Sequence, residues 1–309
     1  MLLSVYYGRW IRTYKEGHIR DITVSKYWNT HKYIEDNFPK LQIEKMNRQD
    51  YQEILNEYAE THERTTVIDF HHMLKAGIRD AYHDGVIKKD PTYRAVMKGM
   101  EPRKKKNKFL HPDEIRKLVS VLDLGQEINV DWFILFLLKT GLRFSEGLAL
   151  TTDDFDWENQ LLNVDKTLFY KDTNIRFVPT KNTFSVRKIA IDWQIIGQFK
   201  PLLNGLEPDE LIFLEKDDKG KYKRPFNSTY NNRLAVLCKQ AGVPVITLHS
   251  LRHTHASLLL SQSVSIQTIS KRLGHSKVTT TQEVYAHVLK DLEAKDNQKM
   301  IGVLSQLGV

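Results

Sequence analysis

The sequence predicts a mainly α-helical protein of two domains, with a small antiparallel β-sheet in the second domain. Residues 1–100 contain segments whose apolar positions repeat at helical spacing. A basic stretch at 102–109 follows, and consecutive like charges repel one another and resist packing. In residues 161–191 the pattern changes to short strands separated by turns. We therefore expect a helical domain at 1–101, a linker at 102–109 and a second domain at 110–309.

The first domain is expected to contain four helices, at 2–14, 23–37, 47–59 and 65–83. Asp21 and Asn47 stand where helix caps are expected. The longest segment repeats apolar residues at helical spacing, and these are Val67, Phe70, Leu74, Ile78 and Ala81. Gly85 and the pair Asp90-Pro91 then end the helix.

The second domain begins with a helix signal at Pro112, followed by two acids that suit a first helical turn. Residues 132–138 are apolar on all sides, which predicts a buried central helix that Gly141 ends. Strands are expected at 161–168, 174–179 and 186–191. Helices resume around Trp193 and at 227–240.

Composition and charge point to a globular protein with a polyanionic partner. The chain has 309 residues, which is enough for two cores, and 41% of them are hydrophobic. The net charge of +8 is unevenly spread, because residues 102–109 hold five cations and no acid, while 1–101 is nearly balanced. Neither domain is broadly basic, so a surface for a polyanion would be a one-sided patch.

No membrane or secretory role is indicated. The longest apolar run, 132–138, is too short to span a bilayer. Arg9 and Arg12 come too early for a signal peptide. The single cysteine, Cys238, excludes an internal disulfide, so we expect a reducing cytoplasm.

The candidate site is concentrated between residues 248 and 285. His249 and Arg252 are three apart in a predicted helix, so their side chains share one face. Gly274 is expected to stop a later helix, which leaves His275 as the first residue of a loop. Tyr285 follows on the next short helix. A titratable base, a fixed cation and a tyrosine hydroxyl are the groups that phosphodiester chemistry without a metal would require.

Two separated motifs resemble the active-site boxes of the tyrosine recombinases, the family of phage and transposon integrases. One is Thr140-Gly141-Leu142-Arg143-Phe144-Ser145-Glu146. The other, about a hundred residues later, comprises His249-x-x-Arg252, Leu273-Gly274-His275 and Tyr285. Their order and context make this a specific signal, whereas either motif alone would be much weaker.

The resemblance implies a role for each site residue. Tyr285 would attack a DNA phosphodiester and form a 3′-phosphotyrosyl bond with a free 5′-hydroxyl. Arg143 and Arg252 would clamp the non-bridging oxygens, His249 would be the base, and His275 would hydrogen-bond the phosphate. Glu146 either orients Arg143 or is a simple helix-stabilising carboxylate.

Lys181 matches the general acid that protonates the leaving 5′-oxygen in this family. It lies in the expected turn after the second strand, although Lys166 and Lys171 occupy the same region and remain alternatives. The linker cations are either a solvated hinge or a set of phosphate contacts, and these are Arg103, Lys104, Lys105, Lys106 and Lys108.

At the level of the whole protein, the resemblance implies a C-shaped clamp on DNA made of a core-binding and a catalytic domain. It implies a tetramer acting on two double-stranded attachment sites, with a tail at about 286–309 exchanged between protomers. Accessory DNA-bending or directionality proteins are possible partners, and no metal or cofactor is expected. The chain begins directly in the expected core-binding helices, so arm-site binding is not assumed.

Three rival interpretations stay open at this point. The same residue set serves type IB topoisomerases, which relax DNA without partner sites. A metal hydrolase is suggested by the crowding of His249, His253 and His255, but no glutamate base stands between the first two. A DNA-binding protein without catalysis is the third. Within the tyrosine recombinase interpretation, His253, His255 and His287 are taken as structural or solvated.

Overall fold

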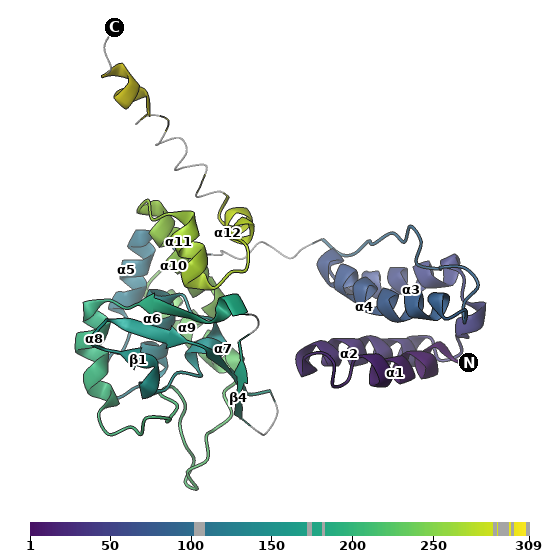
Figure 1. Ribbon diagram of the computed structural model, residues 1–309, viewed down its shortest axis with the longest axis horizontal. Helices are drawn as coiled ribbons and strands as arrows, with labels where there is room; N and C mark the ends of the chain where they lie inside the picture. The colour runs from purple at the N-terminus through teal and green to yellow at the C-terminus, as the bar shows by residue number, and fades with distance from the viewer. Residues whose placement is uncertain are drawn as a thin grey trace. The chain divides into compact units, whose positions relative to one another are not determined.

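The computed structural model describes residues 1–101, 109–171, 175–180, 183–286, 289, 297 and 300–306. The chain divides into two compact units, residues 1–105 and 106–309 (Figure 1). Each unit has its own buried apolar core. No described helix is both long and apolar enough to cross a membrane.

The first unit is built from two layers of two helices. In Figure 1, α1 lies beside α2 and α3 lies beside α4. The core of this unit is made of buried aromatic and aliphatic side chains such as Tyr7, Ile34 and Tyr51. Each of the four predicted helices is present. Their bounds are α1 Leu3–Tyr14, α2 Asp21–Asn37, α3 Arg48–Thr61 and α4 Arg64–His83, with a 3₁₀ turn at Ile43–Lys45.

Side-chain caps fix where several helices begin. Asn47 accepts hydrogen bonds from the first-turn amides of α3, and the carboxylate of Asp50 accepts one from the amide of Asn47, at 2.9 Å. The predicted cap at Asn47 is therefore confirmed. Asn129 caps α6 in the same way, through the amides of Asp131 and Trp132.

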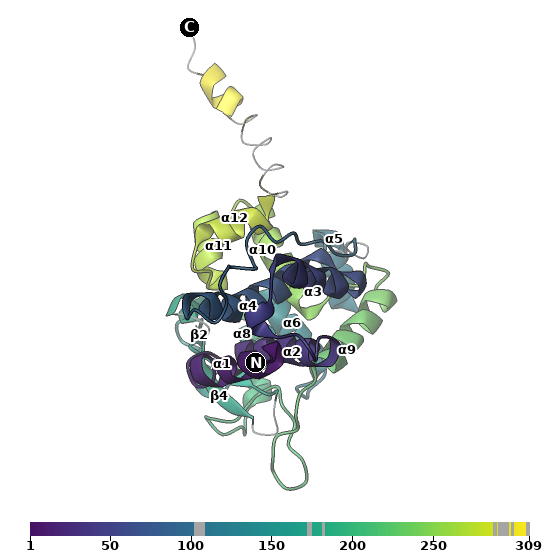
Figure 2. The same ribbon diagram turned by 90° about the vertical axis from the view of Figure 1, so that its right-hand side faces the viewer.

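The second unit is organised around α6, whose side chains are buried on almost every face, as the apolar run predicts. Helix α10 packs along α6, and α11 and α12 lie beside α10 at one end of the unit (Figure 2). The helices are α5 Pro112–Ser120, α6 Val130–Thr140, α7 Phe144–Gly147, α8 Trp193–Phe199, α9 Asn227–Gln240, α10 Leu248–Ser261, α11 Ile266–Leu273 and α12 Val278–Val284. Short 3₁₀ turns occur at Thr152–Asp154, Thr183–Ser185 and Lys200–Leu203.

The strands are antiparallel, as predicted, but they divide into two small sheets. One sheet has the order β1-β2-β5 and the other pairs β3 with β4. The bounds are β1 Phe155–Asp156, β2 Leu161–Val164, β3 Lys166–Phe169, β4 Arg176–Pro179 and β5 Arg187–Ala190. The single strand expected at 161–168 is therefore two strands that separate at Asp165 and join different sheets. The ammonium of Lys166 pairs there with the buried carboxylate of Asp154.

Two glycines end the helices that lead into the candidate site. Gly141 follows α6 at φ 70°, and Gly274 follows α11 at φ 68°, a left-handed conformation that favours glycine. A Cβ on Gly141 would lie 2.6 Å from a ring carbon of His255, and one on Gly274 would lie 3.0 Å from Nη1 of Arg187. Both loops thus need glycine for backbone conformation and for close approach.

Candidate active site

Arg252 occupies the centre of the candidate site. Its side chain comes from α10 and is 3% exposed. Nη1 donates to the carbonyl oxygen of Gly141 at 2.7 Å, and Nη2 donates to the carbonyl oxygen of Leu273. Burial, followed by the charge of Arg143, lowers the pKa of Arg252 to about 9, so it is still a cation at neutral pH. A guanidinium has five N–H donors, and these two bonds leave three for other partners.

Arg143 stands at the start of α7, directly after the loop that contains Gly141. Its guanidinium donates to Oε1 of Glu146 at 2.5 Å and to the carbonyl oxygen of Gly274 at 3.3 Å. Its backbone amide donates to Oε2 of Glu146 at 3.0 Å. The side chain is 30% exposed, so this cation remains accessible from one side.

Glu146 is shared between two arginines. Its side chain is 1% exposed and also accepts from Nη2 of Arg187 at 3.0 Å. Burial opposes ionisation of this carboxyl, but the charges and hydrogen bonds of Arg187 and Arg143 outweigh it and lower the pKa of Glu146. The geometry favours the orienting role for Glu146 over that of a helix-stabilising carboxylate.

Arg187 is a buried member of this cluster that the sequence analysis did not single out. It lies at the start of β5, donates from Nε to the carbonyl oxygen of Arg272 at 2.6 Å, and donates from Nη1 to that of Ser185 at 2.8 Å. A signal was present, since Arg187 is two residues before the buried Ile189 and therefore faces inward. An inward-facing arginine requires a buried partner.

The charges of these four side chains do not balance. Arg143, Arg187 and Arg252 are cations and Glu146 is the anion among them, which gives a net charge of +2. The carboxylate holds two of the cations in position without cancelling the positive field. Such a cluster suits an anionic ligand that gains negative charge as it reacts.

His249 and His275 adjoin the cluster. His249 is exposed, yet partial desolvation and then the charges of Arg252 and Arg143 lower its pKa. His275 is half-buried, and burial and then the same two cations lower its pKa to about 4. Nδ1 of His275 lies 2.8 Å from the hydroxyl oxygen of Thr281. Both imidazoles are therefore neutral at neutral pH.

Tyr285 ends α12 and is nearly inaccessible, with 2% of its side chain exposed. Its ring packs in an apolar cluster with residues of α10 and α11 such as Leu260 and Leu273. Burial raises the pKa of Tyr285 to about 12, although the charge of Arg252 acts in the opposite direction. Its hydroxyl oxygen lies 3.0 Å from Nδ1 of His253.

The histidines that the sequence analysis treated as structural have different environments. Nδ1 of His255 donates to the carbonyl oxygen of Leu138, and Nε2 accepts from Nε of Arg272, both at 2.9 Å, so His255 is a structural residue. His253 instead contacts the hydroxyl of Tyr285. Its spacing of four residues from His249, which puts both on one helix face, was the available signal. His287 lies outside the described residues.

Lys181 lies outside the described residues, as do the linker cations Arg103, Lys104, Lys105, Lys106 and Lys108. Of the alternatives for the general acid, Lys166 has a structural role. Its Nζ lies 2.6 Å from the carboxylate of Asp154 and 3.2 Å from the hydroxyl of Thr151. The carbonyl oxygen of Lys171 accepts a hydrogen bond from Arg224.

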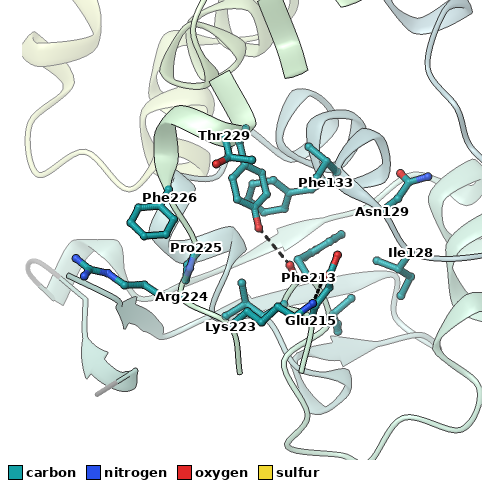
Figure 3. A pocket seen from close by; sticks show the side chains of 14 residues that line it. Ile128, Asn129, Phe133, Phe213, Glu215, Lys223, Arg224, Pro225, Phe226 and Thr229 are labelled. Atoms are coloured by element: carbon teal, nitrogen blue, oxygen red, sulfur yellow. Dashed lines mark hydrogen bonds and ion pairs between the residues drawn. The ribbon is translucent and has the colours of Figure 1, made fainter. Parts of the chain in front are cut away.

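A separate pocket of about 410 Å³ opens between the first turns of α6 and α9. Figure 3 shows Arg224 and Phe226 at one end of this pocket and Asn129 with Ile128 at the other. Its lining includes none of the described catalytic candidates, so it is distinct from the candidate site. Within the ranges that the structure describes, no three His, Cys, Asp or Glu side chains are grouped as metal ligands.

Residues 108–291 match the sequence model described as the phage integrase family. The ICEBs1 integrase of Bacillus subtilis (strain 168) is 27% identical over 285 residues, which cover 88% of this chain and 75% of that protein. The integrase of Staphylococcus phage L54a is 32% identical over 173 residues, covering 52% of this chain and 48% of its own. The chain thus spans between about half and three quarters of these relatives.

Solved structures show the same fold. A chain of the Tn1549 transposon integrase (residues 82–397) in complex with circular intermediate DNA superposes with a TM-score of 0.77 at 22% identity, covering 96% of this chain and 99% of that one. A chain from the structure of a lambda integrase (75–356) dimer bound to a COC′ core site superposes with a TM-score of 0.65 at 18% identity, covering 92% of this chain and 95% of that one. The fold is that of the two-domain tyrosine recombinases. The chain belongs to the phage integrase family.

The carboxylate of Glu146, shared by Arg143 and Arg187, should make the folded protein less stable as the pH falls. Because the pKa of Glu146 is lowered in the folded protein, its ionised form adds stability above the ordinary glutamate pKa of about 4.3, and this is lost as pH falls through the folded value. Glu146→Gln should lower the free energy of unfolding at pH 7 by about 3–5 kcal/mol, since the buried Arg187 and the partly exposed Arg143 both lose their anionic partner. Urea unfolding at several pH values measures both effects.

The matched control is Glu210→Gln. Glu210 also has a lowered pKa, caused first by its hydrogen bond with Lys216, but this pair is partly exposed, with 20% of the Glu210 side chain and 39% of the Lys216 side chain accessible. This substitution should change stability by about 0–1 kcal/mol. Equal losses in the two variants would show that Glu146 does not hold the cluster together.

Proposed function

We propose that this protein is a site-specific DNA recombinase that cuts and rejoins DNA through a phosphotyrosyl intermediate, and so integrates or excises a mobile element. The observation that carries the proposal is the convergence of Arg143, Arg252, His249, His275 and Tyr285 from three separate segments around one cationic cluster. Membership of the phage integrase family supports it.

In this proposal a DNA phosphodiester occupies the positive field of Arg143 and Arg252. The pentacoordinate transition state carries two negative charges, which the net charge of +2 of the cluster complements. The remaining N–H groups of Arg252 and the accessible side of Arg143 donate to the non-bridging oxygens. Preorganised donors of this kind contribute on the order of 10²–10³ in rate each.

The histidines supply neutral groups beside these cations. If the hydroxyl of Thr281 donates to Nδ1 of His275, then Nε2–H of His275 is the donor to the phosphate. His249 can act as a general base, because its lowered pKa keeps the imidazole unprotonated at neutral pH. Lys181 protonates the leaving 5′-oxygen, an assignment that the structural commitment of Lys166 to Asp154 supports.

We also propose that both units bind double-stranded attachment sites and that four protomers act together in the cytoplasm, on the nucleoid. The Tn1549 and lambda integrase chains of similar fold were solved on DNA, and the lambda integrase as a dimer. The cations at 103–108 would contribute to phosphate binding, and accessory DNA-bending or directionality proteins would control the outcome.

The first test concerns the nucleophile. Tyr285→Phe removes one oxygen and one hydrogen bond, so fold and DNA affinity should change little, at about 1 kcal/mol. Suicide DNA substrates should trap a covalent protein–DNA adduct with the parent protein and none with the variant. An adduct that persists in Tyr285→Phe would show that Tyr285 is not the nucleophile. Plasmid relaxation without recombination by the parent would favour a type IB topoisomerase instead.

The second test concerns Lys181. Lys181→Ala should cleave ordinary DNA slowly, on the order of 10²–10⁴-fold below the parent, because the leaving oxygen lacks its proton donor. The defect should disappear on a substrate whose 5′-bridging oxygen is replaced by sulfur, since a thiolate leaves without a proton. Equal defects on both substrates would assign Lys181 to phosphate binding.

The third test concerns the tail. Four apolar side chains at 300–304 are more than half exposed, and a helix of this length needs a groove to be stable in water. These side chains are Met300, Ile301, Val303 and Leu304. Deleting 296–309 should leave single-site DNA binding intact and weaken two-site complexes on native gels. A loss of thermal stability in the free monomer would show that the tail packs on its own unit.

A further inference from the structure

The hydroxyl of Tyr285 is hydrogen-bonded to His253 and not to His249. The oxygen lies 3.0 Å from Nδ1 of His253, and the two rings have centroids 5.8 Å apart at 60°. The ring of His249 stands edge-on to His253, with centroids 4.8 Å apart at 89°. These side chains therefore form a row of three rings that ends at the nucleophile.

The row is held by the secondary structure. His249 and His253 are one turn apart on α10, and Arg252 between them is fixed by the carbonyl oxygens of Gly141 and Leu273. Tyr285 is fixed from its other side by the apolar cluster of α10 and α11. The contact between His253 and Tyr285 thus lies inside the candidate site, where solvent is largely excluded from the hydroxyl.

A buried phenol cannot lose its proton to bulk water, so the neighbouring imidazole is the available acceptor. We propose that His253 is a catalytic residue that takes the hydrogen of the Tyr285 hydroxyl during DNA cleavage, with His249 supporting the ring of His253. This inference rests on the function proposed above and changes which residue is the general base. The residue that accepts the proton directly from Tyr285 is His253 instead of His249.

The step balances as follows in the neutral tautomer whose Nδ1 is the acceptor. The Oη–H bond of Tyr285 breaks, its proton goes to Nδ1 of His253, and the oxygen lone pair forms the Oη–P bond. The P–O5′ bond breaks, and the 5′-oxygen receives its proton from the general acid. In rejoining, the 5′-hydroxyl returns its proton to the deprotonated general acid as its oxygen attacks phosphorus. The Oη–P bond then breaks, and the imidazolium of His253 gives its proton to the departing Tyr285 oxygen.

The experiment varies the acidity of the nucleophile and the presence of the base together. His253→Phe keeps a ring for packing and removes both nitrogens, and 3,5-difluorotyrosine at position 285 gives a more acidic phenol. Single-turnover cleavage of a suicide substrate is measured for parent and His253→Phe, each with tyrosine or difluorotyrosine. His253→Phe with tyrosine should be on the order of 10²-fold slower than the parent.

With difluorotyrosine, the defect of His253→Phe should shrink to a few-fold, because an acidic phenol needs no base. His253→Asn places an amide near the position of Nδ1 that can hydrogen-bond but cannot take a proton, so it should be as slow as His253→Phe. DNA affinity and thermal stability of both variants should stay close to those of the parent.

Several results would overturn the proposal. One is an equal defect of His253→Phe with both nucleophiles, and another is parental activity in His253→Asn, which would leave His253 an orienting role only. A third is suppression by difluorotyrosine of the defect in His249→Phe but not in His253→Phe. Loss of DNA binding in both His253 variants would assign the residue to structure. Absence of a covalent adduct in the parent would instead contradict the proposed function itself.

Discussion

The guanidinium of Arg252 joins the two loops on which the candidate site depends. One loop follows α6 and leads to Arg143, and the other follows α11 and leads to His275. Because both acceptors are main-chain carbonyl oxygens near helix ends, the cation also satisfies groups that helices leave without partners. Segments more than a hundred residues apart in sequence are thereby held within one hydrogen-bonded cluster.

The electrostatic design follows from a single buried carboxylate. Glu146 could balance the charge of only one arginine, yet it contacts two. Arg252 adds a third cation, which donates to the carbonyl oxygens of Gly141 and Leu273. Burying such an excess is costly unless the cations are anchored to backbone oxygens, and both Arg187 and Arg252 are. The result is a cluster with a net positive charge, beside neutral histidines that do not add to the repulsion.

Much of this structure was predictable because its signals are local. Helix caps such as Asn47 and helix stops such as Gly141 and Gly274 depend on adjacent residues, and they are where the sequence placed them. The break at Asp165 was missed, although Lys166 interrupts the alternation of the buried residues Leu162, Val164 and Leu168, because long-range pairing decides that the two segments join different sheets. The two sequence motifs identified Arg143, Arg252 and Tyr285 as candidate site residues. The contacts of Arg187 and His253 depend on tertiary packing, so no local pattern specifies them.

Anchoring a buried arginine to main-chain oxygens also affects which substitutions this protein can tolerate. A carbonyl group is present at every position, so no substitution at 141 or 273 can delete the acceptor itself. A substitution at these positions can displace the two accepting oxygens only by changing the backbone conformation of the loops. That conformation depends on Gly141 and Gly274. Substitutions should therefore be least tolerated at Gly141 and Gly274, whose backbone conformations favour glycine. A substitution at Leu273 would keep the accepting oxygen and would act mainly through the apolar cluster that contains its side chain.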